Sequence, residues 1–190
     1  MIYNLQSFFA DLALVTVEMF PMDTRAMGEA GSSLRPVQLG YRLWRGQVKI
    51  APSHHNDARL IEAKIARLTE VDAFFEVSPP HKQEDGETGT LSGVGANDRR
   101  LVELTGISPS AGDFIGLQTG EFRSLHYVSS VGASIVIVPP LPISITTGSV
   151  ASTAVPTMYA QVTKDAGVRS YRAAVAGEFT LPFMQTLRAS

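Results

Sequence analysis

Beyond residue 100 the chain is divided by glycine and proline into short runs of β-branched and other apolar residues. Regular turn signals between runs of this kind are typical of a small β-barrel or β-sandwich. Only one segment elsewhere has the period of a helix. We therefore predict a mainly β protein, and in this part of the chain we expect strands at 101–104, 113–118, 125–131 and 134–138.

The helical segment begins near residue 57. Apolar residues recur there at steps of three and four, which places them in one stripe along a helix. Ser53 or Asn56 precedes the pattern and can cap the first turn through its short polar side chain. We predict one α-helix at about 56–73. The stripe consists of Ala58, Ile61, Ile65 and Leu68.

The chain before this helix has the character of strands. The β-branched run at 15–17 favours a strand over the end of a helix. Alternation of apolar with other residues predicts a second strand over about 37–50. In that phase Trp44 falls on the face opposite the aliphatic residues. That face is covered, or Trp44 lies at a subunit contact, or a bulge at Gly46 shifts the phase.

A polar and glycine-rich segment at 81–100 interrupts the chain after the helix. Segments of this composition are exposed, so we predict a long loop or the entry to an inserted unit. Alternating patterns return at 158–162 and 168–184 and predict further strands.

Charge and cysteine content exclude several classes of protein. The net charge is −2 with both signs spread along the chain, which argues against a nucleic-acid binder. The absence of cysteine excludes a disulfide scaffold and a thiol nucleophile, and it fits folding in a reducing cytoplasm. The most apolar stretch, 131–145, is broken by glycine and proline. We expect a soluble protein with no membrane span and no export signal.

The one cluster that resembles a metal or nuclease site is His54-His55-Asn56-Asp57. Adjacent side chains diverge on a helix and point to opposite faces on a strand, so the two histidines are poorly spaced to share a ligand. The further histidines, His81 and His126, lie far along the chain. We interpret the cluster as a polar helix entry and expect no metal site.

Two other patterns of catalytic sites are incomplete. The segment 93–98 is rich in glycine but lacks the helix start and the Lys-Ser/Thr end of a phosphate loop, so we interpret it as a turn. No Gly-x-Ser-x-Gly elbow occurs, and the serines have no assignable histidine and carboxylate partners. We expect no catalytic and no cofactor-binding residues, and therefore no enzyme.

The order of motifs is more informative than any single motif. A strand with Trp44-Arg45-Gly46 leads into a helix rich in Ala, Arg and Leu. A glycine-rich crossing at 89–95 and a Gly-Asp-Phe-Ile strand at 112–115 follow. A hairpin closes on Pro139-Pro140-Leu141, and the strand at 155–158 returns to the main unit. In this order the motifs resemble the distal tail proteins of long-tailed (siphovirus-like) bacteriophages or of related gene-transfer particles.

The resemblance implies a division of the chain into two units. Residues 1–85 and 154–190 are expected to form a tube-like β-sandwich domain with one α-helix. Residues 86–153 are expected to form a small inserted β-barrel.

The resemblance also implies a structural role in the virion. Copies are expected to assemble in the host cytoplasm into a hexameric ring in the tail tip. The ring joins the tail tube protein to the hub or tail-fibre protein and surrounds the channel for DNA, with the acidic run 84–87 near that channel. The alternatives are another tail tube, terminator or baseplate component of a phage-like particle, and a carbohydrate-binding β module.

Overall fold

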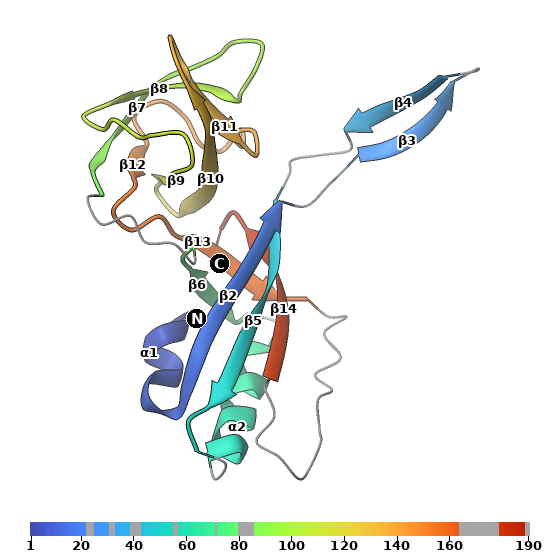
Figure 1. Cartoon of the computed structure of the whole chain (residues 1–190), viewed down its shortest axis with the longest axis vertical. Coiled ribbons are helices and arrows are strands. Elements are labelled where there is room, and N and C mark those ends of the chain that lie inside the picture. Colours follow the sequence, from blue (N-terminus) through green and yellow to red (C-terminus); the bar gives the residue numbers. More distant parts are fainter. Residues whose placement is uncertain are drawn as a thin grey trace.

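The structure is a computed structural model that describes residues 1–21, 25–30, 33–38, 43–54, 57–70, 72–79, 86–163 and 179–188. It contains a six-stranded sheet with helices against it, a closed six-stranded barrel and a separate two-stranded hairpin (Figure 1). The predicted fold class, mainly β with a small barrel, is therefore confirmed.

The sheet has the strand order β1-β6-β13-β14-β5-β2. Strands β1 and β6 are parallel, and all other neighbours in this sheet are antiparallel. Its two edges, β1 and β2, are joined in sequence by a short helix and a 3₁₀ turn. The strands are β1 (Ile2–Asn4), β2 (Ala13–Pro21), β5 (Trp44–Pro52), β6 (Phe74–Val77), β13 (Met158–Val162) and β14 (Phe179–Thr186).

One face of the sheet is covered by helices. Helix α2 (Ala58–Leu68) buries the three last positions of the predicted stripe against this face, and its bounds lie inside the predicted 56–73. The structure adds a helix that the sequence did not predict, α1 (Leu5–Phe9), followed by the 3₁₀ turn η1 (Ala10–Leu12). Asn4 caps α1, because its side-chain oxygen accepts a hydrogen bond from Ser7 N at 3.1 Å.

The prediction of one strand over 37–50 is wrong. One strand, β4, ends at Gln38 and another, β5, begins at Trp44. Trp44 is buried in phase with Val48 and Ile50, and the register with both neighbouring strands is continuous, so β5 has no bulge. The alternation over 37–43 lies before the first residue of β5, so it carried no information about the face on which Trp44 lies.

The barrel has the strand order β10-β11-β8-β7-β12-β9 and encloses its own core, separate in composition from that of the sheet. All four strands predicted beyond residue 100 are present, as β8 to β11. The strands are β7 (Thr88–Val94), β8 (Leu101–Thr105), β9 (Phe114–Thr119), β10 (Phe122–Val131), β11 (Ile135–Val138) and β12 (Val150–Ser152). The fully buried side chains of this core include Leu91, Ile115, Leu117, Val128, Ile137 and Leu141.

The polar segment 81–100, predicted as a loop or an entry to an insertion, contains strand β7. Only Leu91 of this strand is fully buried, so the apolar alternation that marks a strand is nearly absent from its sequence. Residues 80–85 and most of the predicted strand 168–184 lie outside the described residues, and β14 begins at Phe179.

The chain leaves the sheet after β6, forms the barrel, and returns in β13, the neighbour of β6. Val77 at the end of β6 lies opposite Met158 at the start of β13. The ends of the barrel segment are tied together, since Thr153 N donates to Glu87 O at 2.9 Å and Glu87 N donates to Thr153 Oγ1 at 2.9 Å.

Candidate functional site

The histidine cluster predicted as a polar helix entry is only partly described. His54 lies in an irregular segment before α2, and Asp57 precedes the first helical residue without a capping bond from its side chain. His55 and Asn56 lie outside the described residues. Among the described residues, no group of three or more His, Asp or Glu side chains is arranged to hold a metal ion.

The glycine-rich segment 93–98 is the end of β7 and the turn that follows it. The Asp98 carboxylate accepts hydrogen bonds from the backbone and the guanidinium of Arg100, and these bonds lower the pKa of Asp98 to about 2. The segment closes a turn, in agreement with its interpretation from sequence.

Glu84 and Asp85 of the acidic run lie outside the described residues, whereas Gly86 and Glu87 lie within them. The carboxylate of Glu87 accepts a hydrogen bond from Ser108 N at 2.6 Å. It therefore fixes a loop of the barrel.

Sequence patterns gave no sign of a buried Ser–His pair inside the barrel. Ser124 Oγ lies 2.7 Å from His126 Nε2, and His126 Nδ1 lies 2.8 Å from Pro139 O. Burial lowers the pKa of His126 to about 4, so the ring is neutral at pH 7. Neutral His126 donates from Nδ1 to the Pro139 carbonyl and accepts the Ser124 hydroxyl proton at Nε2. Both side chains are about 1% exposed, which closes the pair to a substrate.

The edge of the sheet at β2 is long, regular and open. Nine consecutive pairs join β2 to β5 without a shift in register, and within the described residues β2 has no partner on its other side. Leu14 is 71% exposed and Phe20 is 45% exposed on this strand. The one charged residue of β2 is Glu18, whose pKa is lowered by hydrogen bonds from Lys49 and Gln47.

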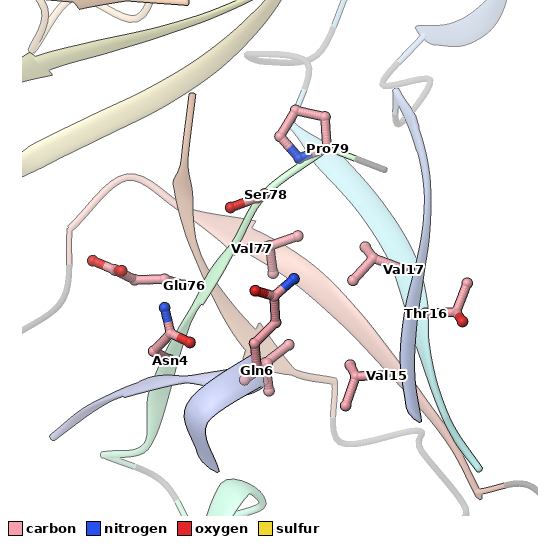
Figure 2. A pocket seen from close by; sticks show the side chains of 10 residues that line it. Asn4, Gln6, Val15, Thr16, Val17, Glu76, Val77, Ser78 and Pro79 are labelled. Atoms are coloured by element: carbon pink, nitrogen blue, oxygen red, sulfur yellow. The ribbon is translucent and has the colours of Figure 1, made fainter. Parts of the chain in front are cut away.

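A cleft of about 330 Å³ runs along this edge (Figure 2). Val15 and Val17 form one wall, Val77 and Pro79 face them from the chain at the end of β6, and Gln6 of α1 lies at the base. The last residue of β6 that pairs with β1 is Glu76. Residues 78 and 79 lie beyond this pairing. The cleft therefore lies between two stretches of extended backbone, with apolar side chains on both.

The chemistry of the cleft suits an extended polypeptide better than a reacting substrate. Glu76 is the single charged residue among the described residues that line it, and Glu76 already pairs with Arg123 at 2.6 Å. Unpaired strand backbone next to small apolar side chains is the arrangement used for strand addition.

The hairpin is the second feature without a partner. Strands β3 (Arg25–Ala30) and β4 (Ser33–Gln38) pair with each other over six residues and with no other described strand. Figure 1 shows the hairpin extending from the ends of β2 and β5, away from both the sheet and the barrel. Sequence reasoning missed this hairpin because it merged the second strand with β5.

No helix among the described residues combines the length and apolar character needed to cross a membrane. A scan against protein-family models finds no match to the chain, and a search of curated proteins finds none either.

Proposed function

We propose that this chain is a structural virion protein whose copies form a ring, with six subunits, in the tail tip of a phage-like particle. The ring connects the tail tube to the hub or fibre proteins and lines the channel for DNA. One observation carries the proposal: within the described part of the chain, a sheet edge is open and a hairpin pairs with no other strand. The similarity of the motif order to distal tail proteins supports the place in the particle and the number of subunits.

The open edge supports assembly because soluble proteins normally protect such strands. The usual devices are bulges, edge lysines, prolines and short strand length. Strand β2 is nine residues long and bulge-free, and its only proline is its last residue. Its single charge, Glu18, is bound to Lys49 on the neighbouring strand. An edge of this kind is suited to pair with another chain.

The hairpin supports assembly for a complementary reason. A two-stranded hairpin on its own is marginally stable in water, because it has no sheet face or helix to pack against. Among the described strands, β3 and β4 pair only with each other. A neighbouring subunit supplies the missing surface without any change in the rest of the fold.

If the open edge of one copy binds the hairpin of the next, the contact between copies is head-to-tail. Contacts of this type generate a closed ring when the rotation between subunits closes, and a filament when it does not. The similarity to distal tail proteins favours the closed ring.

The first test is the mass of the purified protein by light scattering after size exclusion, with negative-stain images of the same fractions. We expect a ring of six subunits with an open centre. A monomer at every accessible concentration contradicts the proposal.

A variant without the hairpin tests the observation that carries the proposal. Pro21 lies opposite Trp44 in the β2–β5 pair, so residues 22–43 can be replaced by an Asn-Gly turn that joins the two strands in register. We expect a folded monomer. Its far-ultraviolet circular dichroism spectrum should show that the remaining strands and helices are intact. Assembly equal to that of the intact chain would show that the hairpin plays no part in the ring.

A further inference from the structure

Strand β10 lies at the boundary between the barrel and the sheet. Successive residues of a strand point to opposite faces. Val128 belongs to the barrel core, whereas Leu125 is fully buried in the core cluster of the sheet. Phe114 of the neighbouring strand β9 also packs against the sheet cluster. The barrel thus contributes side chains to the hydrophobic core of the other unit.

Trp44, the first residue of β5 in the sheet, contacts β10 and β9 of the barrel. Its indole Nε1 donates to Leu125 O at 2.6 Å, and its ring centroid lies 5.8 Å from that of Phe114. Its backbone N donates to Gln185 Oε1 at 3.1 Å, which orients the start of β5. Trp44 is 5% exposed, so the contact excludes water.

Arg123 makes a second, polar contact from the same strand. Its Nη1 donates to Glu76 Oε1 at 2.6 Å and to Thr157 Oγ1 at 3.1 Å. Its guanidinium carbon lies 4.8 Å from the ring centroid of Tyr159. Glu76 and Tyr159 are opposite each other on β6 and β13, so Arg123 contacts two strands of the sheet.

The backbone adds a third contact. Arg123 N donates to Leu187 O at 2.9 Å, and Phe122 and Arg188 form an antiparallel bridge. The segment after β14 therefore extends onto the barrel. Close packing continues at Gly116, where an added Cβ would lie 3.0 Å from Pro156 Cα on the chain returning to the sheet.

We propose that the barrel and the sheet form one rigid body. The contacts of β10 with the sheet, which we call the joint, hold the barrel in a single orientation. Movement between domains of one chain is the normal expectation unless their interface is large and hydrophobic. Here Leu125 of the barrel is buried in the core of the sheet, and the Trp44 indole hydrogen bond lies beside it. The ion pair of Arg123 and the backbone bridge at Phe122 add polar contacts between the two units. Four different kinds of contact restrain the same strand.

This inference does not depend on ring formation. If the chain forms a ring, each copy presents its barrel at the same angle, so the outer surface of the barrels repeats with the symmetry of the ring.

The protein carries its own reporter of the joint, because Trp44 is its one tryptophan. In a urea titration, tryptophan emission reports on the joint and far-ultraviolet circular dichroism reports on the strands. We expect the two curves to coincide. Exposure of Trp44 at a lower urea concentration than the loss of strand signal shows that the barrel separates first, and overturns the proposal.

Arg123→Ala tests the polar contact, and Arg100→Ala is its matched control. Arg100 also binds a carboxylate, that of Asp98, but this pair lies within one turn of the barrel. We expect Arg123→Ala to lower the midpoint of both curves together and Arg100→Ala to leave them nearly unchanged. Equal midpoints in the two variants overturn the role of Arg123.

A distance measurement tests orientation directly. The chain has no cysteine, so spin labels can be attached at Thr180→Cys on β14 and Ser130→Cys on β10, both exposed strand positions. We expect one narrow distance distribution in the folded protein by pulsed electron paramagnetic resonance. A broad or two-peaked distribution means that the barrel changes orientation, and overturns the proposal.

Discussion

At the scale of single residues, His126 shows how burial decides the protonation of a side chain. Its folded pKa is lowered from 6.5 to about 4, with desolvation as the main cause. The unfolded state therefore binds a proton at a higher pH than the folded state. The stability due to neutral His126 is complete above about pH 6.5 and decreases as the pH falls towards 4, by about 3 kcal/mol in total.

The corresponding measurement is urea unfolding at pH 7 and pH 5 for the protein and for His126→Gln. We expect the difference in unfolding free energy between the two pH values to become smaller in the variant. His54→Gln is the control, since His54 is exposed. An unchanged pH dependence in His126→Gln would contradict the prediction.

Gly46 illustrates a glycine required by a close approach of the backbone. A Cβ at this position would lie 2.0 Å from Glu18 O and 2.8 Å from Phe183 Cζ. We expect Gly46→Ala to lower the unfolding free energy by about 2 kcal/mol or more, as overpacking does in cores. Gly132→Ala is the control, because nothing lies within 4 Å of its added Cβ. Similar melting temperatures for the two variants would refute this explanation of Gly46.

At the scale of elements, the sequence predicted what is strongly periodic. Helix α2 was found because Ile61, Ile65 and Leu68 repeat with the helical period over a long segment. Strand β7 was missed because only Leu91 is fully buried, and α1 because five residues are too few to show a period. The phase of Trp44 could not be predicted, since it depends on where β5 begins.

The candidate site was not predictable from local patterns at all. The cleft exists because Val15 and Val17 on one sheet edge face Val77 at the end of β6, some sixty residues along the chain. That geometry follows from the strand order of the sheet and the parallel pairing of β1 with β6. Neither leaves a signature in nearby residues.

The open edge gives a prediction at this scale. Thr16 lies on the edge strand β2 and Thr180 on the interior strand β14, and both are exposed. A lysine on an edge strand opposes pairing with another chain. We expect Thr16→Lys to shift the oligomer towards monomer in light scattering and Thr180→Lys to leave it unchanged. Loss of assembly in Thr180→Lys alone would point to the face of the sheet instead of its edge.

At the scale of the whole molecule, the joint makes the barrel part of the stability of the sheet. Replacing residues 86–153 by a short Gly-Ser link removes Leu125 from the sheet core and uncovers Trp44 and Tyr159. We expect this variant to melt at a lower temperature and over a broader range than the intact chain. The control keeps the barrel and inserts the same link after Pro79. A sharp transition at the original temperature in the deletion would show that the sheet is independent of the barrel.

The hydrogen bonds between Glu87 and Thr153 also affect the order in which the chain folds. Val77 and Met158 are neighbours in the sheet but are separated by the whole barrel in sequence, and closing a long flexible loop costs chain entropy. Three of the six strand pairings in the barrel, β7–β8, β9–β10 and β10–β11, join strands that are consecutive in sequence and can form first. Once they have done so, Glu87 and Thr153 are held together, and the remaining loop between β6 and β13 is short. Barrel formation thus turns one long-range contact of the sheet into a nearly local one.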